Sequence, residues 1–185
     1  AFAGIGSQRI ALRNIKVDYE SVGICEVDKN AILAYDSIHN KQKDEMQYPD
    51  KESILLEFSD KNIGYNFSNG KSEIPKNIID LQKLYKAHIL SNNYGDIRKL
   101  KVELLPDFDL FTYSFPCKNI SVAGNQEGFV EGSNTQSSLL WECKKIIEYK
   151  KPKYLMMENV KNIIGKNHIE YFKTWMKWLE DMGYT

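Results

Sequence analysis

The sequence lacks any excess of charge and any long hydrophobic run. Its 25 lysines and arginines are balanced by 25 aspartates and glutamates, so the net charge is zero. A balanced composition gives no electrostatic indication of nucleic-acid binding. No stretch approaches the roughly 20 apolar residues that are needed to cross a bilayer. Charge alone therefore favours an enzyme that acts on a small molecule.

Cysteine is also scarce. The three cysteines are Cys25, Cys117 and Cys143, an odd number without a CxxC or Cys/His spacing. This pattern excludes a disulfide scaffold and a zinc site, and it predicts an intracellular, reducing setting.

Both ends of the sequence read as cut from a longer polypeptide. Residues 1–6 form a glycine-rich turn of the kind that normally follows a buried strand, yet no strand precedes them. Residues 181–185 read as the end of a helix that runs into a new strand. We therefore expect residues 1–185 to be one partial catalytic, cofactor-binding domain.

Strand-like and helix-like patterns alternate along the chain. We predict helices at 7–14, after the capping residue Asp28, at 76–91, at 137–149 and at 169–182, and strands at 21–27, 109–115 and 154–157. Residues 41–75 are polar and weakly periodic, which predicts a loop-rich insertion. The alternation predicts an α/β fold with a doubly wound, mostly parallel sheet of the Rossmann-like type, truncated at both ends.

The glycine-rich turn and Glu26 predict a cofactor site, because ligands of such sheets bind beyond the carboxyl ends of the strands. The turn allows the backbone to approach a ligand closely. Arg9, however, breaks the GxGxxG dinucleotide fingerprint. Glu26 follows Gly6 by 20 residues and can accept hydrogen bonds from ribose hydroxyls. These features favour a nucleoside-type cofactor over a nicotinamide dinucleotide; the alternative is a structural turn and a solvated Glu26.

Two further residues at strand ends carry candidate chemistry. Cys117 follows Pro116 at the end of a predicted strand and begins a glycine-rich segment, which makes it a candidate nucleophile. The alternative, a small buried hydrophobe, suits Cys25 and Cys143. Glu158 ends an apolar strand, so we expect it to be partly desolvated and able to hydrogen-bond to or protonate a ring nitrogen. A helix-capping or loop-bracing role is its alternative.

At these residues the sequence resembles the C5-cytosine DNA methyltransferases, over almost the whole chain and with the motifs in the family's order. The segments that carry the resemblance are Phe2-Ala3-Gly4-Ile5-Gly6, Glu26-Val27, Gly95-Asp96-Ile97, Phe115-Pro116-Cys117 through Ser121-Val122-Ala123-Gly124, Ser138-Leu139-Leu140-Trp141-Glu142 and Glu158-Asn159-Val160. Each fragment alone is weak, but six in register are highly specific.

The resemblance implies the fold of the S-adenosylmethionine-dependent methyltransferases, with S-adenosyl-L-methionine as cofactor and S-adenosyl-L-homocysteine as product. The cofactor residues that it implies are Phe2, Ala3, Gly4, Ile5, Gly6, Glu26, Val27, Asp96, Ile97, Pro116 and Leu139. It implies that Cys117 is the nucleophile that adds to C6 of a flipped cytosine and that Glu158 acts at N3. Lys118 and Ser121 are the implied DNA contacts.

Three positions depart from the commonest family pattern: Ser114 stands where glycine is usual, Lys118 where glutamine usually follows the cysteine, and Gln136 where arginine is often found. These departures leave the chemistry intact and bear on how the loop meets DNA. The resemblance also implies that the target-recognition region would lie beyond Thr185. We expect a monomer whose partner is double-stranded DNA, with no metal and no membrane.

Other interpretations stay open at this point. A cytosine-C5 methyltransferase of tRNA would carry the same motifs. A non-catalytic relative that binds cofactor or DNA would typically lose Cys117 or Glu158, and both are present. A nicotinamide-dependent enzyme is disfavoured by the incomplete glycine fingerprint.

Overall fold

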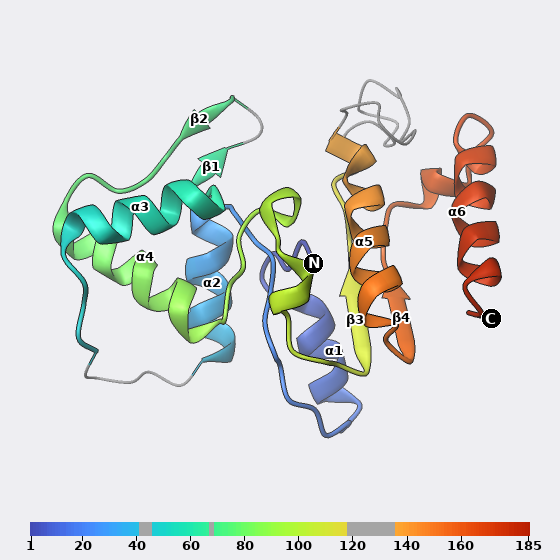
Figure 1. Ribbon diagram of the computed structural model, residues 1–185, viewed down its shortest axis with the longest axis horizontal. Helices are drawn as coiled ribbons and strands as arrows, with labels where there is room; N and C mark the ends of the chain where they lie inside the picture. The colour runs from blue at the N-terminus through green and yellow to red at the C-terminus, as the bar shows by residue number, and fades with distance from the viewer. Residues whose placement is uncertain (41–45, 67–68, 118–135) are drawn as a thin grey trace. The chain divides into compact units, whose positions relative to one another are not determined.

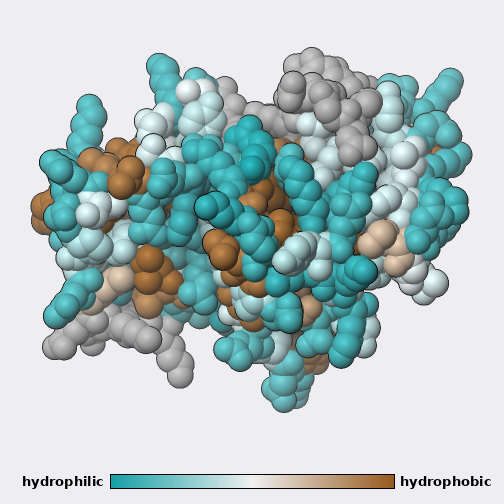
Figure 2. Space-filling model, in the orientation of Figure 1, coloured by the Kyte–Doolittle hydropathy of each residue, from teal (hydrophilic) through white to brown (hydrophobic). Residues whose placement is uncertain are grey.

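The computed structural model describes residues 1–40, 46–66, 69–117 and 136–185, which form a mixed α/β structure with small sheets (Figure 1). The chain divides into two compact units, Phe2–Leu100 and Lys101–Thr185 with Ala1. Within these ranges no helix is both long and apolar enough to cross a membrane. The visible face is mostly hydrophilic, with small apolar patches (Figure 2).

The unit Phe2–Leu100 is mainly helical. Its elements are α1 (Ser7–Asn14), α2 (Lys29–His39), α3 (Lys51–Lys61), the short antiparallel pair β1 (Tyr65–Asn66) and β2 (Lys71–Ser72), and α4 (Ile78–Leu90). Helix α4 packs against both α2 and α3. Their apolar faces form one buried cluster made of Ile32, Ile54, Phe58, Ile63, Leu81, Leu84, Tyr85 and Ala87.

Local capping by a side chain explains where two of these helices begin. Asp28 accepts hydrogen bonds from the backbone of Asn30 and Ala31, at 2.8 and 2.9 Å, and so begins α2 as predicted. Asn77 caps α4 in the same way, and the prediction at 76–91 is confirmed to within two residues. The prediction at 7–14 is confirmed by α1.

The loop-rich prediction for 41–75 is wrong where α3 lies. Asp50 caps this helix by accepting a 2.8 Å hydrogen bond from the backbone of Ser53. Ile54 and Phe58 stand four residues apart on the face that packs into the core, and both are fully buried. Packing against α4 stabilises this helix, and the apolar Leu55 and Leu56 between the two buried residues obscured the helical spacing in the sequence.

The strand predicted at 21–27 is also mostly wrong. Among the residues that the structure describes, Ile24 is the one member of this segment that pairs, in an isolated parallel bridge with Asn93. The backbone of Ile24 accepts from Tyr94 at 2.8 Å and donates to Asn92 at 3.2 Å. The partner segment is short, since it leaves α4 and turns away at Gly95, where φ is 73°. No longer ladder can form along so few residues.

The unit Lys101–Thr185 contains a parallel pair of strands. Its elements are β3 (Leu110–Tyr113), α5 (Leu140–Lys150) with the 3-10 turn Gln136–Leu139 before it, β4 (Tyr154–Met157) and α6 (Ile169–Asp181). Strands β3 and β4 run in register from Leu110 beside Tyr154 to Tyr113 beside Met157. These elements confirm the predictions at 109–115, 137–149, 154–157 and 169–182 apart from small shifts of their ends. The described residues hold two two-stranded sheets rather than the single larger sheet that the alternation predicts.

Aromatic packing fixes the end of β3. The indole nitrogen of Trp175 on α6 donates to the hydroxyl of Tyr113 at 3.3 Å, and burial raises the pKa of that phenol. The ring of Trp141 on α5 meets the ring of Trp175 edge-on, with centroids 5.4 Å apart. Both helices are thereby tied to the strand whose end carries Phe115, Pro116 and Cys117.

Candidate functional site

The glycine-rich turn is closed by the carboxylate of Glu26. Phe2, Gly4 and Gly6 all have positive φ, at 57°, 53° and 77°, so the chain reverses sharply before α1. The backbone N–H of Gly4 donates to Oε2 of Glu26 at 2.8 Å. The backbone of Ala3 donates to the carbonyl of Cys25 at 3.2 Å. The structure therefore brings the predicted turn and the predicted ribose acid together.

The second oxygen of Glu26 organises the start of α2. Oε1 accepts hydrogen bonds from the backbone N–H groups of Val27, at 2.8 Å, and Asp28, at 2.9 Å. Glu26 is thus a half-buried residue with three backbone partners, which argues against a freely solvated side chain. A carboxylate that accepts three N–H groups is held in one orientation, with the rest of its acceptor capacity available to a ligand.

Asn93 is a residue of this site that the sequence pattern did not reveal. Its side-chain oxygen accepts from the backbone of Glu26 and of Gly95, both at 3.0 Å. Its amide nitrogen donates to the carbonyl of Glu26 at 2.9 Å. The amide therefore pairs with Glu26 as a neighbouring strand would. The only sequence signal was the Asn-Asn-Tyr-Gly stretch, which reads as a helix stop.

Replacing Asn93 with aspartate is expected to lower the free energy of unfolding by about 2–4 kcal/mol. The substitution places a second oxygen against the buried carbonyl of Glu26, where the amide donated. Chemical denaturation monitored by circular dichroism measures the change. The matched control is Asn92→Asp at the neighbouring exposed position, which should change stability by less than about 0.5 kcal/mol. Equal effects of the two variants would contradict this role of Asn93.

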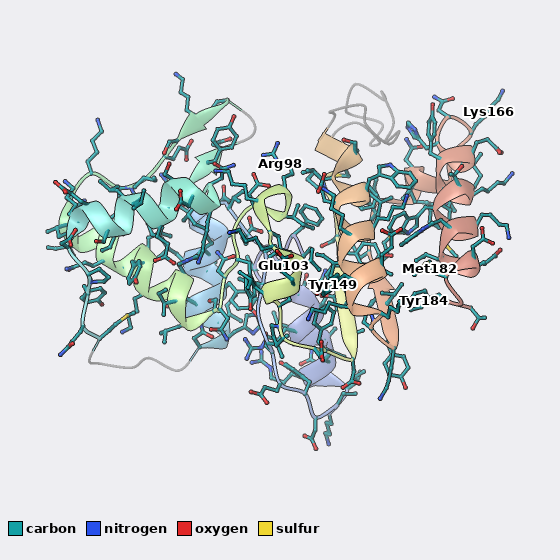
Figure 3. All side chains as sticks on the ribbon, viewed as in Figure 1. Arg98, Glu103, Tyr149, Lys166, Met182 and Tyr184 are labelled. Atoms are coloured by element: carbon teal, nitrogen blue, oxygen red, sulfur yellow. The ribbon has the colours of Figure 1, made fainter. Side chains whose placement is uncertain are left out.

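Asp96 is buried and already bound within its own unit. Both of its oxygens accept from the guanidinium of Arg98, labelled in Figure 3, and Oδ2 also accepts from the side chain of Asn62 at 2.7 Å. Burial alone would raise the pKa of Asp96, but the hydrogen bonds from Arg98 and Asn62 lower it below its ordinary value. The carboxylate is therefore kept charged by two neighbours.

The end of α3 joins the segments around Val27 and Asp96. The backbone of Gly64 donates to the carbonyl of Val27 at 2.7 Å, and the backbone of Asp96 donates to the carbonyl of Lys61 at 2.8 Å. A Cβ on Gly95 would clash with that same Lys61 carbonyl. The structure thus gathers the predicted residues Glu26, Val27, Asp96 and the buried Ile97 around one short connection.

In the other unit, two side chains hold the backbone that leads to Cys117. The hydroxyl of Ser137 donates to the carbonyl of Pro116 at 2.7 Å. The amide of Asn159 donates to the carbonyl of Phe115 at 2.9 Å. Cys117 itself is half-buried. Of the predicted cofactor residues, Pro116 accepts one of these hydrogen bonds and Leu139 follows Ser137 by two residues. The sequence pattern did not indicate this role for Ser137 or Asn159.

Glu158 extends the parallel ladder beyond β4. Its backbone N–H donates to the carbonyl of Tyr113 at 3.1 Å, so the residue leaves the sheet beside the end of β3. Its side chain is exposed, and the expectation of a partly desolvated carboxyl is wrong for the described residues. Glu158 follows Met157, the last residue of β4, so its side chain lies beyond the paired part of the sheet.

The other two cysteines, Cys25 and Cys143, are buried. Burial raises the pKa of the Cys25 thiol to about 11. Both therefore suit the structural interpretation. Lys118 and Ser121, the implied DNA contacts, lie outside the described residues. Within the described residues, no group of three or more His, Cys, Asp or Glu side chains could hold a metal ion.

The chain is similar to methyltransferases of bacteria and their phages. Residues 61–185 match the family described as C-5 cytosine-specific DNA methylase. The whole chain is 49% identical to the type II methyltransferase M2.ScrFI of Lactococcus lactis subsp. cremoris, of which it covers 52%. It is 38% identical to the orphan methyltransferase M.SssI of Spiroplasma monobiae, of which it covers 51%. Over 99% of the chain the identity to the orphan methyltransferase M.Rho11sI of Bacillus phage rho11s is 29%, and 26% of that protein is covered. The chain thus spans about half the length of the first two relatives.

Proposed function

Because the chain belongs to the C-5 cytosine-specific DNA methylase family, we propose that its full-length protein transfers a methyl group from S-adenosyl-L-methionine to C5 of cytosine in double-stranded DNA. The observation that carries the proposal is the pair of strand ends in the second unit. Strands β3 and β4 end in register, with Cys117 after the first and Glu158 directly after the second. A nucleophile and an acid at one edge of a parallel sheet suit attack on a flipped base.

The proposal also includes a fold, the doubly wound sheet of the S-adenosylmethionine-dependent methyltransferases. The parallel pair β3–β4 and the parallel bridge between Ile24 and Asn93 are pieces of the arrangement that a doubly wound methyltransferase sheet requires. Helices α1, α2, α5 and α6 alternate with these segments along the chain. We assign the chain to part of such a domain.

The first unit fits the cofactor. Glu26, oriented by its three backbone partners, would bind the ribose hydroxyls. The N-terminus of α1 directly after the turn has no side-chain cap and no acidic residue in its first turn, which suits the carboxylate of the methionine part. The remaining cofactor residues of the proposal are Phe2, Ala3, Gly4, Ile5, Gly6, Val27, Ile97, Pro116 and Leu139.

Asp96 would bind the adenine amine, and this contact would require the carboxylate to give up an existing hydrogen bond. Within the described residues, the hydrogen bonds to its carboxylate come from Asn62 and Arg98. The side chain of Arg98 is 44% exposed, so its guanidinium can give up a hydrogen bond to Asp96 and remain solvated. Binding of adenine would then replace part of the Arg98 interaction.

Cys117 and Glu158 would carry the chemistry. The cofactor, when bound, supplies the electrophilic methyl group. The thiolate of Cys117 adds to C6 of the flipped cytosine, while Glu158 hydrogen-bonds to or protonates N3, so that C5 becomes nucleophilic. After C5 has gained the methyl group, loss of the C5 proton expels Cys117 and restores the ring. Ser137 and Asn159, which bind the carbonyls of Pro116 and Phe115, would hold the backbone that precedes Cys117 for this attack. Lys118 and Ser121 would contact the DNA.

The proposal predicts methyl transfer to duplex DNA. The full-length protein, given cofactor with a labelled methyl group, is expected to label cytosine C5 in unmethylated duplex DNA at least about 100-fold faster than in tRNA. Scintillation counting after purification of each nucleic acid measures the two rates. Preferential labelling of tRNA would favour the alternative of an RNA cytosine methyltransferase. No labelling of either would contradict the catalytic proposal and favour a non-catalytic relative.

A further inference from the structure

We propose that His39 is a positioning residue that, together with Glu26, holds the glycine-rich turn in its cofactor-binding shape. The inference rests on the proposed function, since the turn is assigned there to S-adenosyl-L-methionine. His39 ends α2 and lies outside every segment in which the chain resembles the family. His39 makes two kinds of contact with the turn: a hydrogen bond to Ile5 and a van der Waals contact with Gly6.

The polar contact restrains the centre of the turn. The imidazole Nε2 of His39 lies 2.9 Å from the carbonyl oxygen of Ile5. A carbonyl only accepts, so Nε2 carries the proton and donates. The N–H of Gly4, one residue earlier, donates to Glu26 at 2.8 Å. Two side chains therefore bind the backbone of the turn: Glu26 binds the N–H of Gly4, and His39 binds the carbonyl of Ile5.

The apolar contact sets how closely the turn lies on α2. A Cβ on Gly6 would sit 2.7 Å from the Tyr35 ring and closer still to the imidazole of His39. The two rings have centroids 4.5 Å apart and are tilted by 46°. Gly6 also has φ of 77°, which favours glycine. The backbone of the turn thus rests directly on a platform formed by Tyr35 and His39.

Arg9 ties this platform to α1, the helix that begins at the turn. Its guanidinium donates to the hydroxyl of Tyr35 at 3.2 Å and to that of Tyr19 at 3.3 Å. Burial, together with the positive charges of Arg9 and Arg13, lowers the pKa of His39, although the hydrogen bond to Ile5 opposes this. The lowered pKa favours the neutral imidazole, and the 2.9 Å contact with the carbonyl of Ile5 makes it a hydrogen-bond donor in that form.

Three variants of the full-length protein test the role of His39. His39→Phe keeps a ring on Tyr35 but removes the donor to Ile5. His39→Gln can place its amide nitrogen near the position of Nε2, whereas His39→Asn is too short to reach the carbonyl. The control is Ser37→Ala at an exposed position of the same helix. Titration calorimetry with S-adenosyl-L-homocysteine measures affinity, and thermal unfolding without ligand measures stability.

We expect His39→Phe and His39→Asn to raise the dissociation constant of S-adenosyl-L-homocysteine about tenfold, the effect of losing one hydrogen bond in the bound shape. His39→Gln and Ser37→Ala should stay within about twofold of the unaltered protein. In the methylation assay, the KM for S-adenosyl-L-methionine should rise about tenfold in His39→Phe while kcat changes less than about twofold.

Two results would overturn the inference alone: unchanged affinity in His39→Phe, or a glutamine variant as weak as the asparagine variant. Loss of affinity that only parallels a lower unfolding temperature across all His39 variants would likewise assign His39 to stability and overturn the inference. If the unaltered protein does not bind S-adenosyl-L-homocysteine, the proposed function fails, and the role of His39 fails with it.

Discussion

Replacing Cys117 with serine in the full-length protein is expected to reduce methyl transfer to DNA by at least about 10³-fold. A serine hydroxyl is not ionised at neutral pH and is a far weaker nucleophile toward C6 than a thiolate. The surrounding backbone should stay in place, because Ser137 and Asn159 bind the carbonyls of Pro116 and Phe115 rather than the thiol. Transfer of a labelled methyl group to duplex DNA measures the loss.

Cofactor affinity provides the control for this variant. Most of the residues assigned to the cofactor belong to the unit Phe2–Leu100, whereas Cys117 belongs to the other. The dissociation constant of S-adenosyl-L-homocysteine should therefore change less than about threefold. Cys143→Ala tests for a general effect of thiol loss, since that cysteine is buried on α5, and its turnover should stay within a few-fold. Near-normal turnover in Cys117→Ser would refute its assignment as nucleophile.

The Glu158→Gln variant is expected to reduce turnover by about 10²-fold or more. Glutamine keeps the size of the side chain but can neither donate a proton to N3 nor carry a negative charge. The backbone bond from Glu158 to Tyr113 does not involve the side chain, so the ladder beyond β4 should survive. Single-turnover methylation with saturating DNA measures the chemical step apart from product release.

Binding to duplex DNA distinguishes chemistry from structure at this residue. We expect the affinity of Glu158→Gln for DNA to stay within about threefold of the unaltered protein. Glu148→Gln, at an exposed position on α5, is the matched control for loss of one negative charge and should leave turnover unchanged. If Glu158→Gln turns over normally, Glu158 only braces the strand end.

The sequence predicted helices better than sheets, for a physical reason. Helices α1, α2 and α4 are specified by local signals, such as the caps Asp28 and Asn77 and apolar residues at helical spacing. A parallel strand needs a partner that is distant in sequence. Residues 21–27 carry the composition of a strand, yet within the described part of the chain only Ile24 pairs with such a partner, 69 residues later at Asn93.

In the candidate site too, the contacts that the sequence did not predict join residues distant in sequence. The sequence predicted that Glu26 and the glycine-rich turn would meet, because both follow from the general position of strand ends. It could not predict that Asn93 and Asn62 hold the backbone of Glu26 and the carboxylate of Asp96. Their contacts join residues 67 and 34 positions apart, and an asparagine in a turn looks the same whether or not it makes them.

The carboxylate of Glu26 has a spectroscopic consequence. The amide hydrogens of Gly4, Val27 and Asp28 are bonded to this one side chain rather than to a sheet. Gly4 is bonded to Oε2, and Val27 and Asp28 are bonded to Oε1, so a motion that withdraws the whole carboxylate exposes all three amides to exchange with deuterium. In a nuclear magnetic resonance spectrum, these three signals form a set whose protection rises and falls together, and a ligand that fixes Glu26 slows the whole set at once.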